Sequence, residues 1–212
     1  MSTVHLLVPV KPLRLAKTRL RGAADGGAGD PGAHAELVAA VAFDTVRAAR
    51  RARGVTEVRC VTSDAALTRA LASEGVRTVE DVPAAGLNPA LRHGDEQLRR
   101  DGVARVGALQ ADLPALHPDE LDAALAAAGG DRAFCPDRQG TGTTLLLAEP
   151  GHPLDPRFGD RSAAAHADTG AKQLDGAWPS LRCDVDTAAD LALAREIGLG
   201  PRTRALLAAR GR

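Results

Sequence analysis

Three aspartates stand where the chain leaves predicted β-strands. Asp112 follows the apolar run 103–110, and Asp184 and Asp186 lie at the end of another predicted strand, residues 181–185. Two residues apart on an extended chain, Asp184 and Asp186 would point the same way. Magnesium prefers hard oxygen ligands and takes one or two protein carboxylates together with substrate phosphates. The aspartates therefore predict a magnesium site; the alternatives are a turn role for Asp112 and a helix-cap role for Asp186.

A basic loop follows the first predicted strand. It holds Lys11, Arg14, Lys17 and Arg19 close together, although the only other lysine of the chain is Lys172. Runs of charge are usually solvated surface. Compact ammonium groups at this place instead favour a cradle for the phosphates of a nucleoside triphosphate. The loop matches neither the Walker A pattern nor the GxGxxG dinucleotide pattern.

Two segments rich in Gly, Ser and Thr could form a second anion site. Residues 140–144 are all Gly or Thr, and residues 158–166 place Gly159 and Ser162 before a predicted short helix. Small residues let backbone N–H groups approach an anion, and hydroxyls add donors. The two segments could jointly hold a small anionic acceptor, with a hairpin turn and a helix cap as the structural alternatives. Asn88 either reaches the nucleotide or caps a helix.

Nucleophilic catalysis and metal–sulfur chemistry are not indicated. The chain has no GxSxG elbow, which is the usual setting of a nucleophilic serine in α/β hydrolases. The histidines that could act as bases are expected to be surface or hydrogen-bonded side chains: His93, His117 and His166. The three cysteines lie far apart without a CxxC pattern, so they are expected to be buried small side chains in a reduced, cytoplasmic protein: Cys60, Cys135 and Cys183.

Composition excludes several classes of protein. The chain has 212 residues, enough for one domain over 1–212, and 27 basic residues balance 27 acidic ones. A neutral chain with only 2% aromatic residues argues against nucleic-acid binding. Neither a signal peptide nor an apolar run of about 20 residues occurs, so no membrane partner is expected.

The elements that must position these side chains alternate along the sequence. Strands are predicted at 4–10, 58–62, 76–79, 103–110, 133–135, 144–147 and 181–185, and helices at 33–53, 65–74, 88–100, 118–128, 162–168, 187–197 and beyond 200. This alternation predicts an α/β fold with a mainly parallel sheet and helices on both faces. Ligands of such sheets bind at the carboxyl ends of the strands, where the candidate residues lie.

The ordered set of motifs resembles one family over nearly the whole chain. The motifs are the 10–20 loop, LNPAL at 87–91, LQADLPAL at 109–116, PDRQGTGT at 136–143, the 158–166 segment and LRCDVDT at 181–187. Together they are similar to the phosphoenolpyruvate / 2-phospho-L-lactate guanylyltransferases, which make the guanylated precursor of the deazaflavin coenzyme F-420. The resemblance implies a single-domain, Rossmann-like nucleotidyltransferase fold shared with molybdenum-cofactor nucleotidyltransferases. Its substrates would be GTP and a phosphorylated three-carbon acid, with Mg2+ as cofactor.

The resemblance also assigns roles to individual residues. The contacts to the three-carbon acid would be Thr144, Gly159 and Ser162, with Lys11 as a further contact. The magnesium carboxylates would be Asp112, Asp184 and Asp186. Lys17 and Arg19 would lie at the GTP phosphates and act in catalysis with Asp112, and Asn88 would lie near the nucleoside.

The acceptor is less sharply indicated than the reaction. An Ala/Arg-rich composition is typical of actinobacterial proteins, which favours phosphoenolpyruvate over 2-phospho-L-lactate by analogy. A sugar-phosphate nucleotidyltransferase of related fold is an alternative, although the Gly-rich LxAGxGxR loop of those enzymes is missing. A GTP-sensing subunit without catalysis is another. A homodimer and hand-over of the product to a downstream deazaflavin transferase are partnerships left open.

Overall fold

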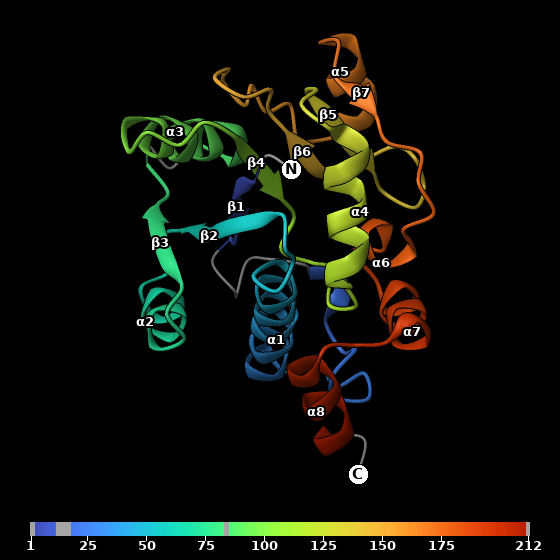
Figure 1. Cartoon of the computed structure of the whole chain (residues 1–212). Helices are drawn as coiled ribbons and strands as arrows, with labels where there is room; N and C mark the ends of the chain where they lie inside the picture. Colours follow the sequence, from blue (N-terminus) through green and yellow to red (C-terminus); the bar gives the residue numbers. More distant parts are fainter. Residues whose placement is uncertain (1–2, 12–17, 83–84, 211–212) are drawn as a thin grey trace.

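A computed structural model describes residues 3–11, 18–82 and 85–210. They form one seven-stranded sheet in the order β3-β2-β1-β4-β6-β5-β7 (Figure 1). The strands are β1 (Val4–Pro9), β2 (Val55–Thr62), β3 (Arg77–Glu80), β4 (Val106–Leu109), β5 (Ala133–Pro136), β6 (Thr143–Leu147) and β7 (Lys172–Gln173). Strand β6 runs antiparallel to its neighbours β4 and β5, and the other pairings are parallel. The predicted mainly parallel α/β sheet is therefore confirmed.

Helices connect the strands and in several cases begin at side-chain caps. They are α1 (Pro31–Ala49), α2 (Ala65–Ser73), α3 (Leu87–Arg100), α4 (Pro118–Ala128), α5 (Ser162–Asp168), α6 (Pro179–Arg182), α7 (Ala188–Ile197) and α8 (Pro201–Arg210), with a short 3-10 helix η1 (Thr18–Leu20). Asp64 caps α2, and Thr187 forms a capping box at α7. Within the described ranges, no helix is long and apolar enough to cross a membrane.

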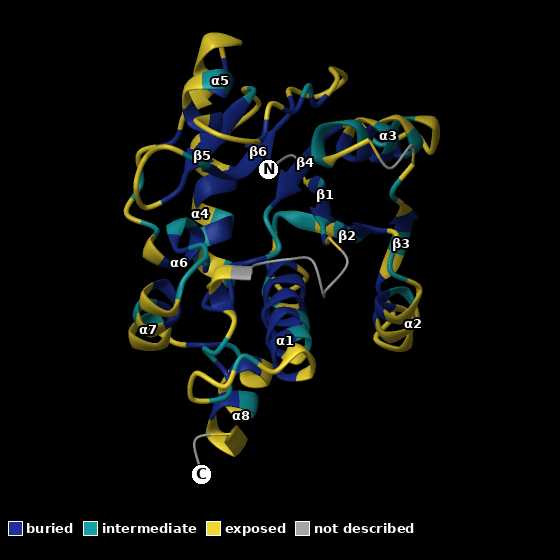
Figure 2. Cartoon of the chain, turned by 180° about the vertical axis from the view of Figure 1, so that it is seen from behind, coloured by how far each residue is buried: buried dark blue, intermediate teal, exposed yellow. Residues whose placement is uncertain are grey.

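The sheet is buried on both faces because its strands are apolar on both sides. Along β1, Val4, Leu6 and Val8 pack into one core with α1, α2 and α4, whereas Leu7 packs into a second core with α3 and α5. This alternation follows the two-residue period of a strand. Figure 2 shows the buried strands between partly exposed helices. The prediction of helices on both faces is confirmed.

A third apolar cluster lies beside the sheet and positions two of the candidate residues, Arg19 and Asp186. It joins Leu20, at the end of η1, to α1, to Val185 and to residues of α7 and α8. Leu20 is 1% exposed and Val185 is fully buried. Burying these two side chains in one cluster holds their chain neighbours, Arg19 and Asp186, close to one another.

The last predicted strand, residues 181–185, is wrong. Residues 179–182 form the helix α6 instead, and residues 183–186 belong to neither a helix nor a strand. The carboxylate of Glu120 accepts hydrogen bonds from the backbone N–H of Ser180 at 2.8 Å and from that of Leu181 at 3.3 Å. These groups therefore need no sheet partner. The edge beside β5 is occupied by β7, a strand that the sequence did not predict.

Candidate active site

A cavity of about 350 Å³ opens beyond the ends of β1 and β4. Its volume lies in the range of small-molecule sites. Of the predicted site residues, Lys11, Arg19, Asp112 and Asp186 line it, together with Pro9, Val10, Leu20, Val38, Val41, Ala42, Leu87, Gln110 and Ala111. The position at the carboxyl ends of these two strands is the one expected for a ligand site in this class of fold.

The backbone around Asp112 is fixed by a threonine of α1. The hydroxyl of Thr45 lies 3.1 Å from the carbonyl of Ala111 and accepts a hydrogen bond from the N–H of Leu113 at 3.0 Å. Thr45 is fully buried, and Asp112 is 9% exposed. The carbonyl of Asp112 in turn accepts the N–H of Val185 at 2.9 Å. This bond draws the 183–187 segment against the end of β4 and brings Asp186 to the cavity.

Asp186 is positioned by the start of α7. The carboxylate of Asp190 accepts the N–H of Asp186 at 3.3 Å, the N–H of Thr187 at 3.0 Å and the Thr187 hydroxyl at 2.7 Å. Arg138 donates to its other oxygen at 3.1 Å. Burial of Asp190 works against its charge, but the hydrogen bonds from Thr187, Asp186 and Arg138 outweigh it and lower its pKa. An ionised Asp190 thus holds the turn that carries Asp186.

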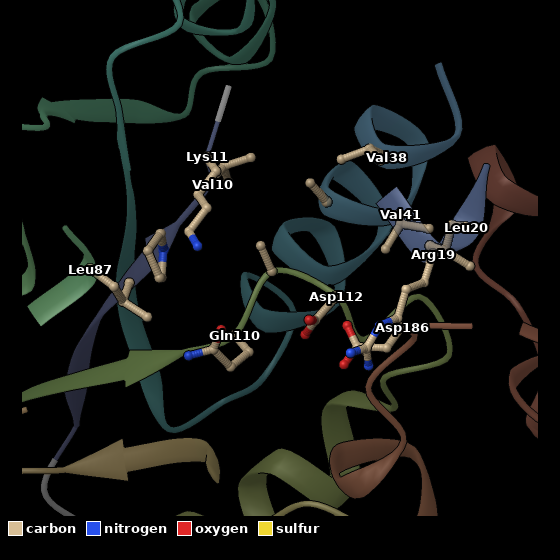
Figure 3. A pocket seen from close by; sticks show the side chains of 13 residues that line it. Val10, Lys11, Arg19, Leu20, Val38, Val41, Leu87, Gln110, Asp112 and Asp186 are labelled. Carbon is tan, nitrogen blue, oxygen red and sulfur yellow. The ribbon is translucent and has the colours of Figure 1, made fainter. Parts of the chain in front are cut away.

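Opposite charges face each other across the cavity. Figure 3 shows the side chains of Arg19, Asp112 and Asp186 pointing toward one another, with Leu87 and Gln110 at the other end of the pocket. Lys11 also lines the cavity. Lys17 lies outside the described residues, so its predicted place at the triphosphate stays a prediction. Two cations and two carboxylates in one cavity suit a ligand with phosphates and a divalent cation.

The donor set fits magnesium. Two carboxylates from separate parts of the chain meet at one pocket, and magnesium usually takes one or two carboxylates and completes its shell with waters and phosphates. Over the described ranges, no cluster of three or more His, Cys, Asp or Glu side chains is arranged to hold a metal ion. Asp184 is not among the residues described as lining the cavity, so its predicted role has less support than those of Asp112 and Asp186.

The two predicted acceptor segments adjoin one another. The carboxylate of Asp137 accepts the N–H groups of Thr141 and Gly142 at 2.9 and 2.8 Å, and the carbonyl of Thr141 accepts the N–H of Ala163 in α5 at 3.0 Å. A Cβ on Gly142 would overlap that carboxylate, which is held in place by its two hydrogen bonds. Glycine is therefore required there for close approach.

The predicted acceptor residues occupy different environments. Thr144 and Ser162 are 0% and 2% exposed, whereas Gly159 is exposed. The hydroxyl of Thr144 lies 3.4 Å from the Cys135 carbonyl. Ser162 is the first residue of α5. The structure therefore brings the two segments together without testing which atoms would contact an acceptor.

Hydrogen bonds of ordinary length connect the acceptor segments to the wall of the cavity. The N–H of Gln110, a lining residue, donates to the carbonyl of Thr144 at 2.9 Å. Asn88, next to the lining residue Leu87, exchanges two hydrogen bonds of 2.8 Å with the backbone of Phe158. Asn88 makes no cap bond at α3. Its predicted contact with the nucleoside stays a prediction.

The predicted environments of His93, His166 and the three cysteines are confirmed, whereas the cytoplasmic location stays a prediction. His166 is fully buried and hydrogen-bonded, and His93 bonds to Gln97 within α3. All three cysteines are free and buried. Burial raises the pKa of the Cys60 thiol to about 12, and that of the other two to about 11. Such thiols stay protonated at neutral pH, so they are not nucleophiles.

Several supporting residues were missed by the sequence reasoning. Thr45 and Gln110 act through contacts with residues remote in sequence, although Gln110 belongs to the 109–116 motif. Asp190 acts through the local capping box. For Asp190 a signal existed, because a Thr followed three residues later by an acidic residue is typical of a capping box. Thr45 is visible in the sequence only as a polar residue within an apolar helical face.

The chain matches a family model over residues 38–182, that of the MobA-like NTP transferase domain. Among curated proteins, it is 53% identical over 203 residues to the phosphoenolpyruvate guanylyltransferase of Geodermatophilus obscurus, covering 95% of this chain and 93% of the relative. It is 52% identical to the protein of that name from Salinispora arenicola, covering 95% and 92%. Among solved structures, a nucleotidyl transferase from Methanothermobacter superposes with a TM-score of 0.63 at 19% identity, covering 92% of this chain and 97% of that one.

A second solved structure agrees over the full length. It comes from Desulfovibrio desulfuricans G20, is provisionally classed as a nucleotide-diphospho-sugar transferase, and superposes with a TM-score of 0.72 at 20% identity, covering 99% of each chain. At such identities the two structures support the fold alone. The relatives at about 50% identity carry the closer relationship. This chain belongs to the phosphoenolpyruvate guanylyltransferase family and has a nucleotidyltransferase fold with a MobA-like NTP transferase domain.

Proposed function

We propose that this protein transfers GMP from GTP to phosphoenolpyruvate and releases pyrophosphate, in the synthesis of coenzyme F-420. The observation that carries the proposal is the meeting of Asp112 and Asp186 with Lys11 and Arg19 in one cavity at the ends of β1 and β4. Family membership gives the reaction class, and the cavity supplies the charges that such a reaction needs.

The reaction exchanges one phosphoanhydride bond for another. A phosphate oxygen of phosphoenolpyruvate attacks the α-phosphorus of GTP in line. A new P–O–P bond forms, the bond from the α-phosphorus to the bridging oxygen of the β-phosphate breaks, and that oxygen leaves with pyrophosphate. The attacking phosphate is already ionised, so no general base is required. The chief barrier is the approach of two anions, and catalysis is positioning and charge neutralisation.

The residues of the cavity, together with Lys17 from outside the described ranges, divide this task between them. Asp112 and Asp186 would hold magnesium, which when bound neutralises phosphate charge and orients oxygens. Arg19, with Lys17 of the same loop, stabilises the departing pyrophosphate. Lys11 neutralises the acceptor. Thr144, Ser162 and Gly159 bind the three-carbon acid in segments hydrogen-bonded to the cavity wall through Gln110 and Asn88.

The test supplies purified protein with GTP, magnesium and one acceptor at a time. The acceptors are phosphoenolpyruvate, 2-phospho-L-lactate and a set of sugar phosphates. Pyrophosphate release is measured, and products are identified by mass spectrometry with the deazaflavin acceptor and its transferase present to trap a labile product. We expect turnover with phosphoenolpyruvate.

The other outcomes separate the alternatives. Preference for 2-phospho-L-lactate would change the acceptor while leaving the reaction as proposed. Turnover with sugar phosphates alone would make the protein a sugar nucleotidyltransferase. GTP binding without pyrophosphate release under any acceptor would leave a sensor and refute the proposal.

A further inference from the structure

The loop of residues 154–161 runs from the region after β6 to the start of α5 and contains Gly159. Two of its residues, Asp155 and Arg161, have positive φ angles of 44° and 54°. Among the described residues, every other residue with a positive φ is a glycine. Left-handed backbone costs free energy in residues with a Cβ, so it persists only where surrounding contacts impose it. Side chains from α3, α5 and the segment before β5 hold this loop at residues 154–158.

Asn88 and His166 hydrogen-bond to the backbone of two successive residues of this loop, Arg157 and Phe158. The Asn88 amide donates to the Phe158 carbonyl and accepts the Phe158 N–H, both at 2.8 Å. The imidazole Nε2 of His166 accepts the N–H of Arg157 at 3.0 Å. Both residues act directly before Gly159. These hydrogen bonds therefore set the position of the Gly159 backbone relative to the cavity.

Two further side chains hold the start of the loop. Asp95, two helical turns after Asn88 in α3, accepts the N–H of Leu154 at 3.1 Å, and Arg132 donates to the carbonyl of Asp155 at 3.0 Å. Asn88 and Asp95 thus use one face of α3, whose first residue, Leu87, lines the cavity. The same helix therefore borders the cavity and anchors the loop.

The environment of His166 fixes its protonation. Because Nε2 accepts from Arg157, the neutral ring carries its proton on Nδ1, which donates to the hydroxyl of Thr143 at 2.9 Å. The rings of Phe134 and Phe158 pack against the imidazole, with ring centroids 5.9 and 5.0 Å from its own. Burial lowers its pKa to about 4, so the ring stays neutral at pH 7. It thereby links β6, next to Thr144, to the loop before Gly159.

We propose that Asn88 and His166 are positioning residues for the acceptor, holding the 157–159 backbone in place to bind the phosphorylated three-carbon acid. This inference rests on the proposed function. It differs from a nucleotide-binding role for Asn88, because both ends of the Asn88 amide are engaged with Phe158. Its distinguishing consequence is an effect on the acceptor and not on GTP.

The test compares variants of similar size. Asn88→Asp keeps the acceptor for the Phe158 N–H but places a carboxylate beside the Phe158 carbonyl. His166→Gln keeps an acceptor at the position of Nε2, whereas His166→Asn reaches only toward Thr143. We expect Asn88→Asp and His166→Asn to raise KM for phosphoenolpyruvate about 5- to 100-fold, the effect of losing a buried hydrogen bond. His166→Gln should keep KM for phosphoenolpyruvate close to the wild-type value. In all three variants KM for GTP should stay within about twofold of wild type.

The matched control is His93→Asn, because His93 makes a comparable 2.8 Å side-chain bond to Gln97 inside α3. It should leave both Michaelis constants unchanged. Hydrogen exchange at the amides of Arg157 and Phe158 gives a readout without turnover, and it should accelerate in Asn88→Asp and His166→Asn. Thermal melting establishes that each variant is folded.

The outcomes separate this inference from the proposed function. Wild-type protein that releases no pyrophosphate from GTP and phosphoenolpyruvate refutes the proposed function and, with it, the acceptor role. Active wild type with faster exchange in the variants but unchanged KM for phosphoenolpyruvate refutes the inference alone. A rise in KM for GTP that equals or exceeds the rise for the acceptor also overturns it.

Discussion

At the scale of single residues, the cavity combines carboxylates and cations that offset one another's charge. Asp112 and Asp186 would repel without a cation, and Arg19 points toward them at the same end of the cavity. Two phosphorylated substrates add further negative charge. Interactions of this kind strengthen where bound substrates displace water, because the local dielectric then falls. Neutralising one carboxylate should therefore affect turnover far more than folding.

Asp112→Asn tests this at the residue with the firmest backbone support. The main-chain bond from Val185 to the carbonyl of residue 112 and the Thr45 contacts involve no side-chain atom of Asp112. The fold should therefore survive. We expect pyrophosphate release to fall at least about 10²- to 10³-fold, the usual cost of one electrostatic contact, with an unchanged melting curve. Asp119→Asn, at a carboxylate whose side chain is 91% exposed in α4, is the control. Wild-type turnover in Asp112→Asn would remove its metal role.

Thr144→Ala and Ser162→Ala test the acceptor site. Both residues are buried in the adjoining segments, and a hydroxyl that bonds the acceptor would donate to its phosphate or carboxylate oxygens. We expect each substitution to raise KM for phosphoenolpyruvate more than KM for GTP, measured by varying one substrate at saturation of the other. Ser73→Ala, an exposed serine of α2, is the control. Equal effects on the two substrates would show that the acceptor lies elsewhere.

At the scale of elements, the segment from α6 to α7 brings Asp186 to the cavity, a role that the sequence assigned to a strand. It reaches the end of β4 through the Val185–Asp112 backbone bond and buries Val185 in the third cluster. Its direction is then set by the α7 capping box. The position of Asp186 thus depends on a turn whose hydrogen bonds converge on Asp190.

The ionised form of Asp190 should stabilise this turn in a pH-dependent way. Its pKa in the folded state lies below the usual value of 3.8, so the stabilisation is present above that value and is lost as pH falls through the lowered pKa. We expect Asp190→Asn to reduce the free energy of unfolding by about 1–3 kcal/mol at pH 7, the cost of a disrupted buried hydrogen-bond set. The difference from wild type should shrink below pH 3.8, as measured by urea denaturation across pH. A pH-independent difference would contradict this.

At the scale of the whole molecule, the predictable features are those encoded locally. Apolar strands such as 4–9 and caps such as Asp64 and Thr187 indicate their own elements, and alternation of elements implies the sheet. Because strand ends gather at one edge, the convergence of Asp112 with Lys11 also followed. The motif set led to the family that the relatives confirm.

What could not be predicted depends on contacts between distant parts of the chain. The 181–185 segment is apolar enough for a strand, but Glu120 satisfies the nearby backbone of Ser180 and Leu181. Thr45 reaches the Asp112 turn only after α1 has packed on the sheet. Asn88 meets Phe158 across 70 residues of sequence. Such partners have no local periodicity or motif, so they become visible only in the folded chain.

The C-terminal helix α8 is another element held by residues distant in sequence, because it packs on α1 (Figure 1). Asp44 of α1, only 3% exposed, accepts the N–H groups of Arg202 and Thr203 at 3.1 and 2.7 Å and so caps α8 from another helix. Asp44→Ala should lower the free energy of unfolding by about 1–2 kcal/mol, as other lost caps do. At 25 °C turnover should be unchanged, because the bonds that hold Asp112 and Asp186 are local to the cavity. Urea denaturation and pyrophosphate release measure the two effects. An unchanged urea midpoint would show that α8 docks through Leu207 and the rest of the third cluster without help from Asp44.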